Sequence, residues 1–393
     1  MSSGPVHALP LAGLRVVDLS RLLPGPYASL VLADLGAEVI KVESTDGGDY
    51  LRYMPPLAPA GAGKASWAFT ALNAGKRSLC VDLKRPEGVD LLRRLTARAD
   101  ILLESFRPGV MDRLGLGYEA LAATNPGLVY CALTGFGQTG PYRDAPGHDL
   151  NYAGLAGALG LGGFVDRPPP VPPIQVADIG GSLWALVAIL AAIHARQASG
   201  RGRFLDVSMT DGVTGFLAAA VAPMLGAAAA PPKRGAEVLT GSAPCYGVYQ
   251  TEDARFMTLA ALEPKFWSAF CGKVARPEWL KRQFDPSVRP EIEALFASRP
   301  RAAWEALFAG SEACCEPVLE PAELADHPLH QARHLVIETT AGLKRLRTPV
   351  RPVDAPAPGP APGLGEHTRA ILGDLGYTPD EIQALAHGKV VVA

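Results

Sequence analysis

The chain has 393 residues, which is enough for a large core and for two domains, and 48% of its residues are apolar against 19% charged. This composition excludes an intrinsically disordered protein, and a net charge of −2 lacks the strong basic character of nucleic-acid binding domains. The six cysteines show no CxxC spacing, which argues against a zinc site or a disulfide framework and favours a reducing compartment.

Neither end of the chain nor its apolar runs predict an association with a membrane. The opening residues MSSGPVHALPLAG lack the basic region and the apolar core of a signal peptide. The apolar runs Leu183–Ile193 and Phe216–Ala230 are too short, or too broken by Pro and Gly, for us to expect a transmembrane span. We therefore expect a cytoplasmic protein with no membrane partner and no nucleic-acid partner.

Strands and helices alternate along the first half of the chain. Six short apolar runs are typical of buried strands: Leu14–Leu19, Glu38–Glu43, Ser78–Leu83, Ile101–Glu104, Leu128–Leu133 and Phe204–Met209. Helical runs separate several of them, and two of these runs, Tyr27–Leu35 and Pro86–Ala99, have proline at or just before their start. This alternation predicts an α/β fold with a large, doubly wound, Rossmann-like and mostly parallel sheet.

Composition divides the chain into five segments. Residues 1–209 are predicted to form the large α/β domain, and the Ala-rich, proline-broken residues 210–239 a linker. In residues 240–325 two strand-like runs precede three helical segments, which predicts a small α+β domain. The proline-rich residues 326–362 read as a second linker, and residues 363–393 as a segment that returns to the large domain.

Two groups that can move protons near neutral pH stand out in the middle of the chain. His148 precedes an apolar run of small residues, and Asp178 precedes Gly180, Gly181 and a long apolar helix. The 30-residue spacing allows both groups to face one pocket from different elements. Backbone N–H groups at the start of that helix, around Gly180 and Gly181, could hold a developing oxyanion. The alternative is that Asp178 only caps the helix.

Three further features allow more than one interpretation. The motif GFGQTG, at 135–140, matches the dinucleotide pattern GxGxxG, but Pro141 and Pro146 follow within six residues, so a tight loop beside the pocket is favoured. Basic residues near strand ends, among them Lys41, Arg107 and Arg113, are either solvated surface charges or contacts for a phosphate-bearing ligand. Glu263 either begins a helix or orients an imidazole.

Long motifs in a fixed order resemble one known family. They are LAGLRVVDLS, LADLGAEVIKVE, ESFRPGVMDRLGLGY, LTGFGQTGPYR, GHDLNY, ADIGGS, LEPKFW and GEHTRAIL. Through them the chain resembles the family III CoA-transferases, or CaiB/BaiF superfamily, and within it the α-methylacyl-CoA racemases.

The resemblance implies a reaction and its residues. The racemases carry a His in GHDxNY and an Asp in DxGG as proton-transfer groups, with a Glu in EPxF supporting the His, and these positions are His148, Asp178 and Glu263 here. The implied reaction inverts the α-carbon of a 2-methylacyl-CoA thioester through an enolate. In the alternative, a CoA-transferase, the Asp is a nucleophile, and the His and Glu are generally missing. A third possibility is a protein that binds acyl-CoA without catalysis. The segment 240–246, where racemases usually read DGGAPYY, departs from the racemase pattern.

The resemblance also implies how the substrate is held. The CoA nucleotide is expected near Lys41, Arg107 and Arg113, the enolate near the N–H groups of Gly180 and Gly181, and no metal or cofactor is expected beyond the CoA moiety. The family further implies an interlocked homodimer, in which the site lies between the large domain of one chain and the small domain of the other. Glu263 would then act within its own chain or across the dimer.

Overall fold

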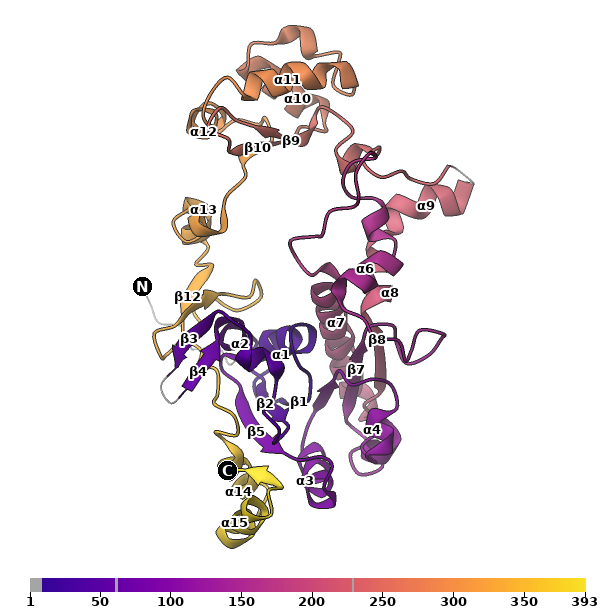
Figure 1. Cartoon of the computed structure of the whole chain (residues 1–393), viewed down its shortest axis with the longest axis vertical. Coiled ribbons are helices and arrows are strands. Elements are labelled where there is room, and N and C mark those ends of the chain that lie inside the picture. The colour runs from indigo at the N-terminus through magenta and orange to yellow at the C-terminus, as the bar shows by residue number, and fades with distance from the viewer. Residues whose placement is uncertain (1–8, 61–62, 228–229) are drawn as a thin grey trace. The chain divides into compact units, whose positions relative to one another are not determined.

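The structure is a computed structural model that describes residues 9–60, 63–227 and 230–393 and divides into two compact units (Figure 1). Unit 1 comprises the described part of Met1–Ala156 together with Pro172–Phe216 and Pro328–Ala393, and unit 2 comprises the described part of Gly157–Val171 and Leu217–His327. Each unit is described by itself.

This division departs from the predicted boundaries in three places. Residues 210–239, predicted to be a linker, are divided between unit 1, which extends to Phe216, and unit 2, which continues from Leu217. Residues 157–171, which the prediction assigns to the large domain, belong to unit 2, where the Arg234 guanidinium donates to the Phe164 carbonyl at 2.9 Å. Residues 328–362, predicted to be a linker, belong to unit 1. There the buried Asp34 carboxylate accepts from the Arg351 guanidinium at 2.9 Å and from the Thr348 hydroxyl at 2.8 Å, which anchors that segment on the first helix.

Unit 1 is built on a sheet with strand order β14-β5-β2-β1-β6-β7-β8. The strands are β1 (Arg15–Asp18), β2 (Glu38–Glu43), β5 (Arg77–Val81), β6 (Ile101–Glu104), β7 (Val129–Thr134), β8 (Phe204–Ser208) and β14 (Val391–Val392). All pairings are parallel except that of β14 with β5. Without β14, the order is the 3-2-1-4-5-6 arrangement of doubly wound folds. The predicted fold class is confirmed, and the direction of winding reverses between β1 and β6.

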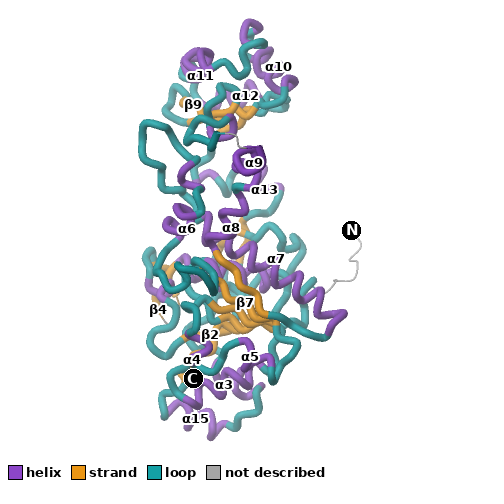
Figure 2. Tube along the Cα trace, turned by 90° about the vertical axis from the view of Figure 1, so that its right-hand side faces the viewer, coloured by secondary structure: helices purple, strands orange, loops and turns teal. Residues whose placement is uncertain are grey.

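Helices and small hairpins complete unit 1 (Figure 2). The helices are α1 (Pro24–Asp34), α2 (Trp67–Asn73), α3 (Pro86–Thr96), α4 (Val110–Arg113), α5 (Tyr118–Ala122), α6 (Asp149–Leu155), α7 (Val176–Ser199), α8 (Met209–Phe216), α13 (Pro328–Ala332), α14 (Thr368–Asp374) and α15 (Pro379–His387). The hairpins are β3 (Leu57–Ala60) with β4 (Gly63–Ser66), and β12 (Val336–Glu338) with β13 (Lys344–Leu346). The largest core cluster joins strand side chains such as Val17 and Leu102 to Leu92 of α3 and Leu372 of α14.

Helix α7 is longer than the sequence pattern indicated. It has 24 residues with a mean hydropathy of 2.0 over its most apolar window, so by length and composition it could cross a bilayer, and the expectation that this run is too short was wrong. Residues 176–182 extend the helix at its N-terminal end, and residues 194–199 extend it at its C-terminal end. Half of the window is buried within the described part of the chain.

Unit 2 contains a three-stranded antiparallel sheet and helices rich in aromatic residues. The strands β9 (Tyr246–Gln250), β10 (Phe256–Ala260) and β11 (Cys315–Pro317) pair in the order β11-β10-β9. The helices are α9 (Ala218–Ala227), α10 (Pro264–Lys273), α11 (Arg289–Phe296) and α12 (Arg301–Phe308). The buried side chains of Trp267, Phe270, Phe296 and Trp304 form the centre of its core. An α+β unit of this kind was expected for residues 240–325.

Candidate active site

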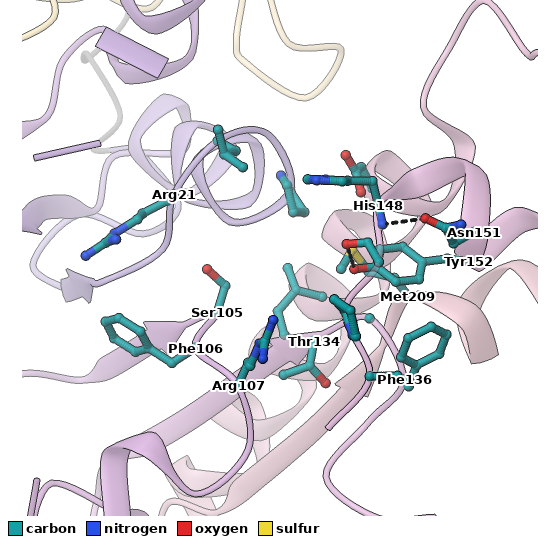
Figure 3. A pocket seen from close by; sticks show the side chains of 18 of the residues that line it. Arg21, Ser105, Phe106, Arg107, Thr134, Phe136, His148, Asn151, Tyr152 and Met209 are labelled. Atoms are coloured by element: carbon teal, nitrogen blue, oxygen red, sulfur yellow. Dashed lines mark hydrogen bonds between the residues drawn. The ribbon is translucent and has the colours of Figure 1, made fainter. Parts of the chain in front are cut away.

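A cavity of about 680 Å³ lies at the carboxyl edge of the large sheet (Figure 3). Its lining follows three strands: residues 19–24 come after β1, residues 105–108 after β6, and residues 133–136 span the end of β7. Side chains from α6 and from the first turn of α7 complete it. Doubly wound folds bind ligands outside the carboxyl ends of the strands, where the winding reverses, and this cavity has that position and the volume of a small-molecule site.

His148 and Asp178 line this one cavity, although 30 residues separate them. His148 precedes α6, and its backbone N–H donates to the Asn151 side-chain oxygen at 3.0 Å, which closes the first turn (Figure 3). Asp178 lies in the first turn of α7. The prediction that His148 and Asp178 face one pocket from different elements is therefore confirmed, and their role in proton transfer stays a prediction.

Asp149 fixes the two elements to each other. One of its carboxylate oxygens, Oδ1, accepts from the backbone N–H groups of Ala177 at 2.7 Å and Asp178 at 3.1 Å. The residue beside His148 thus caps the helix that carries Asp178. The alternative in which Asp178 itself is only a cap does not hold, because its carboxyl group accepts no hydrogen bond from the described residues.

The surroundings of Asp178 change its acidity. Burial, together with the negative charge of Asp149, raises the pKa of its carboxyl group from 3.8 to about 6. A carboxyl group with this pKa populates both protonation states close to neutral pH, so it can remove a proton from one ligand and deliver one to another. This is the acidity that a two-base mechanism requires of one partner.

The predicted oxyanion site at Gly180 and Gly181 was wrong. Because α7 begins at Val176, both glycines lie beyond its first turn, where backbone N–H groups bond within the helix. Two N–H groups of the first turn, those of Ala177 and Asp178, already donate to Asp149.

The two glycines instead allow close helix packing. A Cβ atom at Gly181 would lie 2.5 Å from Cγ of Met209, and one at Gly180 would lie 2.7 Å from the Phe216 ring. Both neighbours belong to α8. The glycines therefore let α8 approach α7, which is a structural role that the sequence pattern alone does not distinguish from anion binding.

Of the three predicted CoA-binding cations, the cavity includes only Arg107. Lys41 is fully buried, with its Nζ atom 2.9 Å from an Asp49 carboxylate oxygen and 3.0 Å from the Ser20 carbonyl oxygen, so a ligand does not reach it. Arg113, at the end of α4, is exposed and lines neither this cavity nor the smaller one beside it. A central strand faces helices on both sides, which is why a lysine inside β2 ends in the core.

Two cations that the sequence interpretation missed also line the cavity. Arg21 lies between β1 and α1, and Arg143 lies in the loop before His148. Arg21 could have been found by applying to β1 the rule that ligands lie after the carboxyl ends of parallel strands. Arg143 lies in an irregular loop and is the last residue of the family motif LTGFGQTGPYR, which could have marked it.

The glycine-rich loop after β7 forms part of the cavity wall, as predicted. Gly137 has a φ of 82°, and its N–H donates to the Thr134 hydroxyl at 3.0 Å. The next helix begins only at Asp149. A dinucleotide fingerprint must open a helix directly, so this GxGxxG motif does not have the required context.

Glu263 belongs to unit 2. It precedes α10, and its backbone carbonyl accepts from the N–H groups of Phe266 at 3.0 Å and Trp267 at 3.1 Å. Its carboxylate does not cap the helix, and the residue is exposed. A role for Glu263 in supporting His148 stays a prediction, because each unit is described by itself.

Comparisons with known proteins show the family of the chain as a whole. The sequence profile described as CoA-transferase family III matches residues 11–368. The chain is 38% identical to the alpha-methylacyl-CoA racemase of Mus musculus, over 97% of each chain, and 34% identical to a succinate–glutarate CoA-transferase of Agrobacterium fabrum, over 95% of this chain and 98% of the other. A solved CAIB/BAIF family protein from Brucella suis is similar with a TM-score of 0.83 and 34% identity, covering 94% of this chain and all of the other.

Proposed function

This chain belongs to CoA-transferase family III, and we propose that within the family it is an α-methylacyl-CoA racemase that inverts the α-carbon of a 2-methylacyl-CoA thioester. One observation carries the proposal: His148 and Asp178 line the same cavity, and the Asp178 carboxyl group has a pKa of about 6. The similarity to the mouse racemase over almost the whole chain supports the same reaction.

In the proposed reaction the two groups act on opposite faces of the α-carbon. One of them removes the α-proton, and the electron pair of the broken C–H bond moves into the thioester to form an enolate. The other group then donates its proton to the opposite face, which inverts the centre. For a substrate of the other hand, His148 and Asp178 exchange roles. General acid–base catalysis contributes about 10²–10⁴-fold, so the enolate must also be stabilised.

Side chains that line the cavity supply the remaining stabilisation in this proposal. Since the N–H groups of Ala177 and Asp178 already donate to Asp149, these two do not serve as an oxyanion hole. The Asn151 amide nitrogen and the Arg107 guanidinium are donors on the cavity wall. Each oxyanion donor typically contributes about 10²–10³-fold to the rate.

A CoA-transferase is the second candidate. The Asp178 carboxyl group accepts no hydrogen bond from the described residues, so it is also available as a nucleophile toward a thioester carbonyl. The similarity to the Agrobacterium fabrum transferase favours this alternative. It requires a second carboxylic acid as acceptor and a covalent intermediate on Asp178, which a racemase does not.

We further propose a cytoplasmic homodimer that needs no cofactor beyond the CoA moiety of its substrate. Leu183, Trp184 and Val187 form an exposed apolar strip on α7, which supports burial of this helix against a second copy. In such a dimer Glu263 supports His148 from its own chain or from the other one. Size-exclusion chromatography with light scattering tests the dimer, and a monomer at micromolar concentration contradicts it.

The experiment for the reaction follows the α-position of a single-handed 2-methylacyl-CoA by NMR in D₂O. Deuterium uptake with loss of chirality, in the absence of an acceptor acid, supports the racemase. If no exchange occurs, but CoA moves to an added carboxylic acid and a thioester is trapped on Asp178, the protein is a CoA-transferase and the racemase proposal is wrong. The experiment is repeated with 2-methylacyl-CoA substrates of several chain lengths, because a single acyl group could be a poor substrate.

A further inference from the structure

The cavity carries more positive charge than the reaction itself requires. Three guanidinium groups line it, from Arg21, Arg107 and Arg143, and Asp178 is its single carboxyl group among the described residues. Arg21 and Arg107 form no ion pair within the described ranges, and Arg143 has only the exposed Asp144 at 3.7 Å. Because three guanidinium groups face a single carboxyl group, the cavity matches a ligand with several negative charges.

Arg21 is held in place by two aromatic rings. The carbon at the centre of its guanidinium group lies 5.5 Å from the centroid of the Tyr50 ring and 5.7 Å from that of Phe106. One guanidinium nitrogen also donates to the Tyr50 hydroxyl at 3.4 Å. These contacts fix the group, and its remaining N–H groups are available for an anion. Figure 3 shows Arg21 and Phe106 on one side of the cavity and His148 and Tyr152 on the other.

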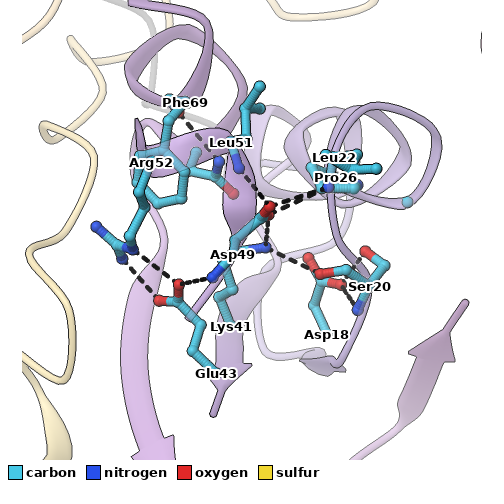
Figure 4. A network of polar contacts seen from close by, with 12 residues as sticks. Asp18, Ser20, Leu22, Pro26, Lys41, Glu43, Asp49, Leu51, Arg52 and Phe69 are labelled. Atoms are coloured by element: carbon cyan, nitrogen blue, oxygen red, sulfur yellow. Dashed lines mark hydrogen bonds and ion pairs between the residues drawn. The ribbon is translucent and has the colours of Figure 1, made fainter. Parts of the chain in front are cut away.

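A buried ion pair holds the backbone on both sides of Arg21 (Figure 4). Lys41 donates to the Ser20 carbonyl at 3.0 Å, and Asp49 accepts from the Leu22 N–H at 3.1 Å. Lys41 and Asp49 are 2.9 Å apart and fully buried. Leu22 has a φ of 63°, an unusual conformation for leucine that this pair of contacts holds. The loop that carries Arg21 is therefore built in one conformation before any ligand binds.

We infer that Arg21 is an anchor for the phosphate groups of the CoA moiety, at the side of the cavity away from His148. In an acyl-CoA the phosphates lie at the opposite end of the molecule from the thioester, so binding them at Arg21 directs the thioester toward His148 and Asp178. The inference rests on the proposed use of a CoA thioester, and it assigns to Arg21 the contact that the sequence interpretation assigned to Lys41.

Binding of free CoA to the full chain, measured by isothermal titration calorimetry, tests the inference. Arg21→Gln should weaken CoA binding by roughly tenfold or more, because it removes a charged hydrogen-bond donor. Arg21→Lys, which keeps the charge without the planar fork, should fall between the wild type and Arg21→Gln. Arg85→Gln removes an exposed arginine outside the cavity and should change the dissociation constant by less than about twofold.

A phosphate-free substrate separates this inference from other roles of Arg21. With an N-acetylcysteamine thioester of the same acyl group, which has no phosphate, Arg21→Gln should retain the wild-type kcat/KM. If Arg21→Gln binds CoA as the wild type does, or loses activity equally on both thioesters, Arg21 is not a phosphate anchor. If a loss appears only with acyl groups that carry a second carboxylate, Arg21 binds the acyl end and the inference is wrong. Failure of the wild type to bind CoA would overturn the proposed function as well.

Discussion

Asp178→Asn should stabilise the protein at neutral pH while abolishing racemisation. Folding buries the Asp178 carboxyl group beside Asp149 and raises its pKa from 3.8 to about 6. The folded chain therefore holds the proton more tightly than the unfolded chain does, so this group's contribution to stability is present below about pH 4 and is lost as the pH rises to about 6. A difference of about two pH units corresponds to about 3 kcal/mol.

Asparagine has nearly the same shape and no charge to desolvate. Urea unfolding of wild type and Asp178→Asn should give a stability difference of about 1 kcal/mol in favour of the variant at pH 4.5, rising to about 3 kcal/mol at pH 7.5. Asp46→Asn, at an exposed aspartate in the turn after β2, is the matched control and should show no such rise. If the difference for Asp178→Asn stays constant between these pH values, the carboxyl group is not desolvated, and the reasoning about its acidity fails.

Two further predictions concern the elements around Asp178. Asp149→Asn should lower the pKa of Asp178, because the negative charge of Asp149 is one cause of its elevation. NMR titration of the Asp178 carboxyl carbon measures this pKa, and an unchanged or higher value would contradict the prediction. Gly181→Ala should cost about 1–3 kcal/mol in thermal or urea unfolding, since its Cβ would lie 2.5 Å from Met209 Cγ. Gly373→Ala, where a Cβ meets open space, should not destabilise the chain, and equal effects at the two glycines would refute the packing argument.

The fold class could be predicted from the sequence because it depends on local periodicity. Each buried strand is a short apolar run, and a strand-helix alternation leaves few ways to pair parallel strands. The boundaries of the two units could not be predicted in the same way. The position of residues 328–362 depends on the ion pair between Asp34 and Arg351, which are more than 300 positions apart in the chain. No local sequence pattern indicates such a contact.

In the candidate site, too, some residues could be predicted from the sequence and others could not. His148, Asp178 and Arg107 line one cavity, and to that extent they were predicted correctly. Each lies at a recognisable start of a helix or end of a strand. Lys41 was placed wrongly, since composition does not show which face of a strand is covered, and its burial with Asp49 depends on a loop that folds back over β2. The sequence predicted free N–H groups at the helix start around Asp178. Only the fold shows that Asp149 accepts hydrogen bonds from two of them.

The most direct test of the two-base account uses single-base variants. His148→Ala and Asp178→Asn are each incubated in D₂O with the two hands of a 2-methylacyl-CoA, and α-proton exchange and chirality are followed by NMR and chiral chromatography. With one base left on one face, each variant should exchange the α-proton of only one hand, without inversion, and the two variants should act on opposite hands. Racemisation that persists in either variant, or exchange of the same hand by both, would contradict the assignment of His148 and Asp178 to opposite faces.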